Sequence, residues 1–430
     1  MINGGLKTMR SINRKKKNIS TLVSGLLLAV LLLTGCGTAG VAADAKDETQ
    51  TQTQTQTQTQ NQDANTASTT GNDEITGTVE VKKDLEPLSV SYPAGNIRVT
   101  VNILALQKGY FEEQGLTVNP VAIGGNDALT AINEENGALD ILTAGFVADV
   151  QAIGAGYDLA FVAGTAVEGG AVIAKKGNAA NFKGTDKLLN IDAVTNAKLG
   201  FARNEAAWIV TRQYLLDNGV SADTIKAIEN EETGNVLFYA DQTATAQAVQ
   251  KGEVDLGFLP MEFALLYADA YDLEVVVAAG DLSPNYVCCR EVTSNKRLNE
   301  KFDSYVAYET ARIKAFEYYK KGETDAAVKA DVVKTVADYS GKEPDYVETY
   351  LYGGVTKFAV DPNTEGIRNY VKAAYNSGVF TGNAVDFGNY DISQNVNTKA
   401  YKQALDGLIA ANPDNEFYKG LLDLFNSANA

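Results

Sequence analysis

Short apolar runs alternate with amphipathic stretches from Leu88 to about position 295, and one such unit occurs twice. It reads AINEENGALDILTAGF from Ala131 to Phe146 and AQAVQKGEVDLGFLPM from Ala246 to Met261. In each copy an amphipathic helix ends at a Gly (Gly137, Gly252), and an Asp and a short apolar run follow. Gly suits the left-handed turn that stops a helix, and the apolar run has the length of a buried parallel strand. A single repetition, about 115 residues apart, predicts two similar α/β lobes rather than a solenoid.

The apolar runs predict two sets of strands separated by the polar stretch 176–190. Helices are expected between them, including one over Asn126–Asn136 capped by Asn126 and one from Asn204 to Gly219 capped by Asn204. After Asn295 the pattern becomes mainly helical. Strands that alternate with helices are typical of parallel α/β structure. The strands are expected at 88–93, 117–124, 140–146, 159–166 and 170–176, and then at 198–203, 235–241, 254–260, 273–280 and 285–292.

The amino-terminal segment has the order of a secretory signal, with basic residues at positions 7–17, the apolar run LVSGLLLAVLLL and small residues before Cys36. The apolar run is too short for a typical membrane-spanning helix. The sequence Leu33-Thr34-Gly35-Cys36 resembles the lipobox of bacterial lipoproteins, which implies cleavage before Cys36 and a diacylglyceryl group on its sulfur. We therefore expect a signal peptide over residues 1–35 and a lipid anchor at Cys36; the alternative is an ordinary signal peptide with an incidental Cys.

Residues 36–86 contain the lipidated Cys and then Thr-Gln pairs with further Asn, Thr, Asp and Gly. Such a segment has almost no apolar surface to bury, so it is predicted to be a disordered tether. The remaining chain is long enough for two domains.

The charge of the chain argues against nucleic acid as a partner. The formal net charge is −17, and removal of the six basic residues before Cys36 leaves 31 basic against 54 acidic residues. This field repels nucleic acid. The chain has no His, which excludes His-based catalytic triads and removes the commonest metal ligand. We expect no cofactor and no metal.

The three cysteines are too few for a disulfide framework and lack the spacing of a zinc site. Cys288 and Cys289 are adjacent in the apolar run NYVCCREV. They are interpreted as small, partly buried residues, with a vicinal disulfide as the alternative.

The segment ALQKGYFEEQGLTVNPVAIGGNDALTAINEENGALDILTAGF (105–146) resembles solute-binding proteins of ABC importers, in the branch with nitrate, taurine, alkanesulfonate and thiamine-pyrimidine-precursor receptors. KLGFARNEAAWIVTRQYLLDNGV and AVQKGEVDLGFLP agree with it. The resemblance implies a type II periplasmic-binding-protein fold, with two lobes whose parallel or mixed sheets are flanked by helices and joined by a two-stranded hinge. Lobe I is expected at 87–175 plus 290–430 and lobe II at 176–289. An enzymatic branch of the family requires a histidine that this chain lacks.

In α/β lobes, ligands bind beyond the carboxyl ends of the strands, near helix N-termini. Asn126 and Asn204 are equally explained as helix caps, Trp208 as a core residue, and Glu205 as a complement to its helix dipole. Glu205 facing the solute would favour an amine or neutral donor, whereas Arg203 argues for an anion. The candidate ligand-binding residues are Gly95, Asn96, Gly125, Asn126, Thr143, Gly145, Phe146, Thr165, Asn204, Glu205, Trp208, Tyr239, Met261 and Glu262.

The leading interpretation is a monomeric, membrane-anchored receptor on the extracytoplasmic face of a bacterial membrane. It would deliver a small nitrogen- or sulfur-containing solute to an ABC permease and its ATPase. The alternatives are a surface sensor or adhesion lipoprotein with the same fold, and an enzyme that uses Glu205 and Glu262.

Overall fold

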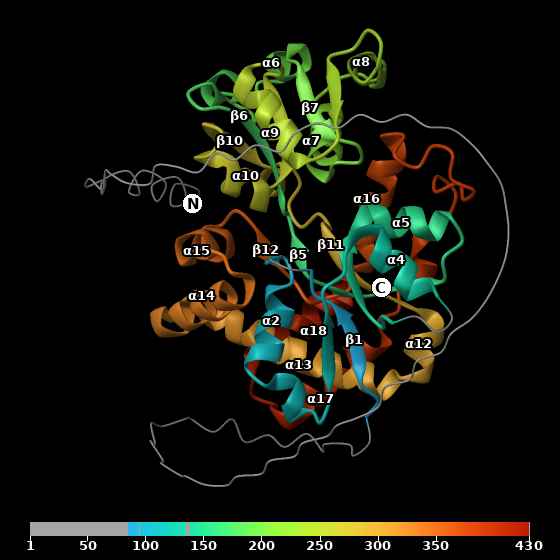
Figure 1. Cartoon of the computed structure of the whole chain (residues 1–430). Helices are drawn as coiled ribbons and strands as arrows, with labels where there is room; N and C mark the ends of the chain where they lie inside the picture. The colour runs from blue at the N-terminus through green and yellow to red at the C-terminus, as the bar shows by residue number, and fades with distance from the viewer. Residues whose placement is uncertain (1–84, 94, 135–137, 430) are drawn as a thin grey trace, which may run out of the picture. The chain divides into compact units, whose positions relative to one another are not determined.

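The computed structural model of the protein describes residues 85–93, 95–134 and 138–429. Within this range the chain forms two α/β lobes, each built on its own sheet (Figure 1). The signal peptide, Cys36, Gly137 and nearly all of the expected tether lie outside the described residues. No helix within the described range has the length and apolarity needed to span a membrane.

Lobe I contains a sheet in which one strand opposes the others. A parallel bridge between Val90 and Ile141 joins the first strand to the residue before the third, and β11 runs antiparallel between β3 and β4. The order across the lobe is therefore β2-β1-β3-β11-β4. Its strands are β1 (Leu88–Ser91), β2 (Val118–Val121), β3 (Leu142–Gly145), β4 (Leu159–Gly164) and β11 (Cys289–Ser294).

Lobe II repeats this arrangement. β7 pairs in parallel with β8 and β9, and β6 runs antiparallel to β9 and β10, so the order is β8-β7-β9-β6-β10. In both lobes the fourth strand in this spatial order, β11 or β6, runs antiparallel to its neighbours. It is also the first sheet strand after the chain arrives from the other lobe. The strands are β6 (Gly170–Lys175), β7 (Leu199–Ala202), β8 (Val236–Tyr239), β9 (Leu256–Pro260) and β10 (Leu273–Ala278).

The duplicated Asp forms the same contact in both lobes. The carboxylate of Asp140 accepts a hydrogen bond from the backbone N–H of Ser89 in β1 (2.8 Å), and that of Asp255 accepts one from Lys198 beside β7 (2.9 Å). The backbone N–H groups of Asp140 and Asp255 in turn donate to the carbonyls of Ser89 and Lys198. This two-way contact fixes β3 beside β1 in lobe I and β9 beside β7 in lobe II.

The chain crosses between the lobes twice, and a third segment pairs with the first crossing. β5 (Ala166–Val167) pairs antiparallel with β12 (Lys357–Phe358), and Val167 also forms an antiparallel bridge with Val287. The first and second crossings thus form the expected two-stranded hinge, and β12 adds a third segment to it. Because β6 belongs to the lobe II sheet, the chain crosses before Gly170, whereas the expected boundary at residue 175 leaves β6 in lobe I.

Two of the predicted helices are capped by other residues than expected. The N-cap of α4 is Gly124 rather than the expected Asn126, and the N-cap of α7 is Glu205 rather than Asn204. Before β11 the helices are α2 (Thr100–Gln107), α3 (Tyr110–Glu113), α4 (Gly125–Asn133), α5 (Phe146–Gly154), η2 (Ala179–Phe182), α6 (Ile191–Asn196), α7 (Ala206–Asp217), α8 (Ala222–Ile228), α9 (Gln242–Lys251), α10 (Met261–Ala268) and α11 (Ala279–Leu282).

The carboxyl-terminal region is mainly helical, as predicted, and packs mostly on lobe I. α13 contacts α2 and α17, while α15 reaches α10 and α16 reaches α7 in lobe II. These elements are α12 (Asn295–Glu300), α13 (Phe302–Lys321), α14 (Ala326–Ser340), α15 (Pro344–Tyr352), α16 (Thr364–Asn376), η3 (Ile392–Asn395), α17 (Lys399–Ala411) and α18 (Glu416–Ala428).

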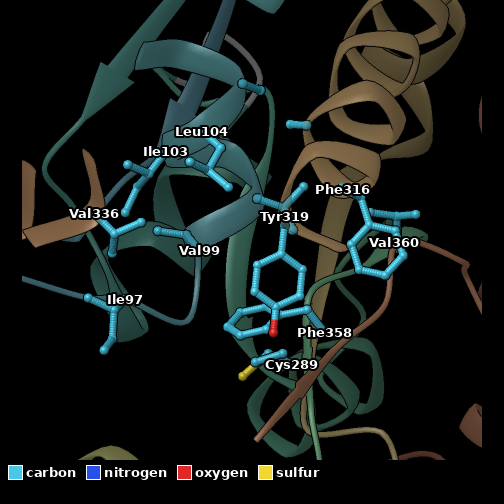
Figure 2. Packing of buried hydrophobic residues seen from close by; sticks show 14 of the residues in the cluster. Ile97, Val99, Ile103, Leu104, Cys289, Phe316, Tyr319, Val336, Phe358 and Val360 are labelled. Atoms are coloured by element: carbon cyan, nitrogen blue, oxygen red, sulfur yellow. The ribbon is translucent and has the colours of Figure 1, made fainter. Parts of the chain in front are cut away.

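The hydrophobic core of lobe I continues to the hinge. In Figure 2, Ile103 and Leu104 of α2 lie near Val336 of α14, while Tyr319 of α13 lies beside Phe358 of β12. The rings of Tyr319 and Phe358 are 5.3 Å apart in an edge-to-face arrangement. Cys289, at the start of β11, is buried in this cluster. The hinge strands are therefore anchored to lobe I by apolar contacts.

A buried polar network fastens β4 and β11, the lobe I strands next to the hinge. Arg312 of α13 is fully buried and pairs with Glu309 (2.8 Å) and Glu291 of β11 (3.3 Å). Its guanidinium also donates to the carbonyl oxygen of Gly164 at the end of β4 (2.6 Å). Burial raises the pKa of Glu309 to about 8, against the opposing effect of Arg312. This network holds β4 and β11 together where the chain leaves lobe I.

Candidate functional site

Two of the predicted residues occupy equivalent places at the ends of β3 and β9. Phe146 begins α5 and Met261 begins α10, and both side chains are buried in the hydrophobic cores. The N–H of Phe146 donates to the carbonyl of Cys288 (3.1 Å), and that of Met261 donates to the carbonyl of Gly169 (2.7 Å). The structure places both residues at the junction of the lobes, with side chains that pack the interior.

An ion pair crosses from lobe I to lobe II. Arg98, in the loop before α2, lies 3.2 Å from the carboxylate of Glu262 in the first turn of α10. The side-chain oxygen of Asn96 accepts the backbone N–H of Arg98 (2.8 Å), and Tyr346 of α15 donates to the carbonyl of Glu262 (2.9 Å). Burial is the largest single influence and lowers the pKa of Arg98, but Glu262 together with Cys289, Tyr350 and Cys288 raises it above the ordinary value. Asn96 and Glu262 were both predicted; Arg98 was not.

Glu205 is a buried carboxyl group at the N-terminus of α7. Its side chain is 7% exposed and accepts a hydrogen bond from the N–H of Ala207 (3.3 Å). Burial raises its pKa to about 7, although the Ala207 N–H and the charge of Arg98 favour the ionised form. Asn204, just before it, has a left-handed backbone (φ 65°) and serves the turn rather than the cap. Glu205 is therefore near half ionisation at neutral pH.

Trp208 is a core residue of lobe II. Its ring stacks on Phe201 with centroids 5.3 Å apart and lies edge-on to Phe258. Its indole N–H donates to Glu229 (2.9 Å). The indole is thus fully engaged within the lobe.

The other predicted residues are distributed around the lobe ends. Thr143 donates to Glu291 (3.3 Å) in the buried network, and the Tyr239 ring lies beside Gly200 in the neighbouring strand. The hydroxyl of Thr165 is buried in the hinge without a partner among the described residues. Gly95 and Gly125 have positive φ angles, as turns require, whereas Gly145 caps α5 in an extended conformation. Asn126 lies in the first turn of α4.

Further polar groups at the lobe junction were missed by the sequence analysis. Asp149 in α5 is fully buried, and neither carboxylate oxygen has a hydrogen-bond partner within the described part of the chain. Burial raises its pKa well above the ordinary value, and the nearby Cys289 adds to this. An Asp in the first turn of an apolar helix ordinarily complements the helix dipole, so the sequence carried no signal of this burial.

Two tyrosines approach the same place from the hinge and from α16. The rings of Tyr286 and Tyr370 are stacked with centroids 6.0 Å apart, and both hydroxyls are buried without partners among the residues described. Burial raises both pKa values, and Cys288 and Glu205 contribute to each. A Cβ at Gly170 would lie 2.9 Å from the Tyr286 hydroxyl, so that oxygen points to the start of β6.

The adjacent thiols lie beside these groups. Cys288 and Cys289 are free, with sulfur atoms 3.7 Å apart. Their mutual hydrogen bond lowers the pKa of Cys289 to about 7 and raises that of Cys288, and the charge of Arg98 favours both thiolates. The two thiols are not joined by a disulfide here; Cys288 is half-buried and Cys289 is buried.

We define the interlobe cluster as Arg98, Asp149, Glu205, Glu262, Tyr286, Tyr370, Cys288 and Cys289. It combines donors and acceptors from both lobes, several buried and unpartnered. Buried polar atoms normally find partners, so such a group is suited to a polar ligand. Among the described residues, no group of three or more Asp, Glu or Cys is arranged to hold a metal ion.

Two cavities in the described range bear on the location of the site. One of about 360 Å³ lies between α7, the loop before β11 and α16, and is lined by Tyr286 and Tyr370 of the interlobe cluster. The other, about 790 Å³, lies around the 183–192 segment and the start of α8, within lobe II. Only the first adjoins the interlobe cluster.

Solved structures resemble the chain, although no family model matches it and no curated protein is similar to it in sequence. A ligand-binding component of an ABC-type import system from Staphylococcus aureus, with zinc bound, has a TM-score of 0.55 at 13% identity, over 74% of this chain and 99% of that one. The periplasmic aliphatic sulphonate-binding protein SsuA from Escherichia coli has a TM-score of 0.54 at 14% identity, over 73% and 99%.

A third similar structure is the periplasmic nitrate-binding protein NrtA from Synechocystis PCC 6803, with a TM-score of 0.54 at 12% identity, over 76% of this chain and 89% of that one. At these identities the likeness is one of fold. This likeness of fold agrees with the strand order shared by the two lobes and with a hinge made of several chain segments. The chain therefore has the two-lobed, type II periplasmic-binding-protein fold expected from its resemblance to that group of solute-binding proteins.

Proposed function

We propose that this protein is the extracytoplasmic solute-binding component of an ABC importer, which captures a small nitrogen- or sulfur-containing solute between its lobes. The observation that carries the proposal is the interlobe cluster, in which Arg98 of lobe I meets Glu262 of lobe II beside unpartnered polar atoms. The fold shared with sulfonate- and nitrate-binding proteins supports it. No bond is made or broken in this role.

The mechanism proposed is closure about the hinge. A solute that contacts both lobes binds the closed form better than the open form and so shifts the population toward it. Hinge closure around ligands is a common transition of two-lobed binding proteins. The closed, liganded form would then present both lobes to the permease and its ATPase.

Thermal unfolding of the full-length protein tests solute binding. The panel contains taurine, alkanesulfonates, nitrate, aminopyrimidines and small amines. A ligand at 100 times its dissociation constant stabilises a protein by about 2.7 kcal/mol, which raises the midpoint by a few degrees. We expect one saturable hit, weakened by Arg98→Met. The matched control is Arg203→Met, which removes an exposed ion pair with Glu231 and should leave affinity unchanged. A folded protein that binds none of the panel contradicts the proposal.

We also propose that the chain is anchored by lipid at Cys36 and acts as a monomer. Cys36→Ser should then move the protein from the detergent phase to the aqueous phase in phase separation, because lipid chains hold a soluble domain at a membrane. Cys288→Ser is the control and should keep the protein in the detergent phase. Equal partitioning of both variants would count against the anchor.

A further inference from the structure

Two neighbouring thiols lie where the chain passes from the hinge into β11. Val287 forms the hinge bridge with Val167. β11 begins at Cys289, so Cys288 lies between the two pairings. Neighbouring side chains of a regular strand point to opposite faces of the sheet. The sulfur atoms of Cys288 and Cys289 are nevertheless only 3.7 Å apart. The backbone here therefore departs from the regular alternation and holds the two thiols within hydrogen-bonding distance.

The surroundings of the pair favour a thiolate, which is the form of cysteine that reacts with oxidants. The hydrogen bond between the thiols and burial raise the pKa of Cys288, whereas the charge of Arg98 and the backbone N–H of Gly169 lower it. The same hydrogen bond lowers the pKa of Cys289 to about 7 against the effect of burial. The pair therefore loses its first proton near neutral pH, and the sulfurs share the proton that remains.

The two sulfurs differ in their access to solvent. Cys288 is half-buried, whereas Cys289 is only 2% exposed. A small oxidant therefore meets Cys288 first. Cys289 lies directly behind it, in the place of a second thiol that can attack an oxidised Cys288.

We propose that Cys288 and Cys289 are a redox modification site, at which hydrogen peroxide closes a reversible disulfide between the two neighbouring residues. The Cys288 thiolate attacks one peroxide oxygen, the O–O bond breaks, and the released hydroxide takes up a proton and leaves as water. The Cys289 thiol then attacks the sulfenic sulfur of Cys288, and its proton leaves with the hydroxyl group as a second water. Two thiols are oxidised to one disulfide, and one peroxide is reduced to two waters.

This disulfide acts on the backbone because it is strained. The Cα atoms of adjacent residues are about 3.8 Å apart, whereas disulfides usually join Cα atoms roughly 4.4–6.8 Å apart. The ring that forms contains the carbonyl carbon of Cys288, and this carbonyl accepts the N–H of Phe146 at the start of α5 (3.1 Å). Closing the ring turns the carbonyl and weakens its hold on α5. Strain also makes the disulfide easy to reduce, so the modification is reversible.

Mass spectrometry of the full-length Cys36→Ser protein tests the modification, because Cys288 and Cys289 are then its only cysteines. The protein is treated with hydrogen peroxide, alkylated with iodoacetamide and digested. We expect the peptide with both cysteines to lose two hydrogen atoms and to take up no reagent. After reduction with dithiothreitol it should take up two alkyl groups.

Single variants assign the two thiols. Cys289→Ala should gain oxygen at Cys288, because a thiol without a partner proceeds to the sulfinic acid. Cys288→Ala should react more slowly than Cys289→Ala, because the remaining thiol is buried. Neither variant should lose two hydrogen atoms within this peptide.

Hydrogen exchange of the same Cys36→Ser protein tests the effect on the backbone. The amide of Phe146 should exchange about tenfold faster after oxidation, because it loses the carbonyl of Cys288. The amide of Met261, which donates to the carbonyl of Gly169 at the equivalent place in lobe II, is the internal control and should keep its rate.

Each outcome decides one part of the inference. A peptide that stays fully open to alkylation after peroxide, or that gains only oxygen atoms, overturns the redox site. A disulfide that leaves the exchange of the Phe146 amide unchanged overturns its effect on α5. None of these measurements uses a solute, so the failure of the redox site leaves the proposed function intact, and the reverse also holds.

Discussion

Glu205 caps α7 with a carboxylate that is almost fully buried, and this makes it a source of pH-dependent stability. Its pKa is about 7 in the folded protein against an ordinary 4.5, chiefly because of burial. A pKa raised by folding gives stability that is present in full below the unfolded pKa and is lost as pH rises through the folded pKa. The relevant window is therefore between 4.5 and 7.

Glu205→Gln should remove this dependence. The difference between the two pKa values corresponds to about 3 kcal/mol. We expect the variant to gain up to about 3 kcal/mol relative to the parent at pH 8 and little at pH 4, as measured by urea unfolding at each pH. Glu232→Gln should show no such trend. A gain that is equal at both pH values would mean that Glu205 does not titrate in this window.

For single residues, the sequence predicted where a residue lies better than it predicted what its side chain does. Asn96, Glu205 and Glu262 were placed at the lobe ends from strand boundaries alone, and the structure brings them to the junction. Trp208 could not be assigned, since helical spacing cannot distinguish a core face from a ligand face. Asp149 was missed because its burial depends on contacts with elements that lie far away in the sequence.

At the scale of elements, the duplicated turn that contains Asp140 and Asp255 was the clearest structural signal in the sequence. Asp140 accepts a backbone hydrogen bond from β1, and Asp255 accepts the equivalent one from the residue before β7, but their surroundings differ. Asp140 is buried and also pairs with Arg297 (3.4 Å) and Lys301 (2.9 Å), whereas Asp255 is exposed. The two Asp residues therefore have the same structural role, but we expect Asp140 to contribute more to the free energy of unfolding than Asp255.

Asp140→Ala should lower the free energy of unfolding by about 3 kcal/mol, because it leaves a strand N–H and two cations without their partner. Asp255→Ala should cost about 1 kcal/mol, the value of one exposed hydrogen bond. Urea unfolding of the two variants gives the comparison. Equal losses would show that the ion pairs of Asp140 contribute nothing.

The sequence predicted which segments form strands and helices better than it predicted how the strands pair with one another. The apolar runs located each sheet strand, since buried strands need continuous apolar side chains. They could not show that β6 and β11 run antiparallel, because direction leaves no mark on a fully buried strand. Helix starts were displaced where Gly124 and Glu205, rather than an Asn, supplied the cap.

For the whole molecule, the hinge depends on a close backbone approach at Gly164. A Cβ there would lie 2.5 Å from the carbonyl oxygen of Ala359 and 2.6 Å from that of Asp361. Gly164→Ala should therefore separate β4 from the third hinge segment and cost roughly 3 kcal/mol. The matched control is Gly407→Ala in α17, where a Cβ meets no atom within 4 Å; it should add about 0.5–1 kcal/mol.

Urea unfolding of both variants checks this prediction. Gly164→Ala with the stability of the parent would mean that the hinge segments can move apart freely. The two-lobed architecture itself was predictable, because the Asp motif is repeated and the first lobe carries a recognisable family pattern. The third hinge segment was not, because β12 contributes only two paired residues.

The nesting of one lobe inside the other implies an order of folding. All strands of lobe II come from one continuous stretch of chain, whereas lobe I must join β4 to β11 across it. Pairing Gly164 with Arg290 in an unfolded chain closes a loop of roughly 125 residues. Once β6 and β10 have paired, the ends of that loop already lie side by side. The entropic barrier to completing lobe I then falls by roughly 2 kcal/mol, and we therefore expect lobe II to form first.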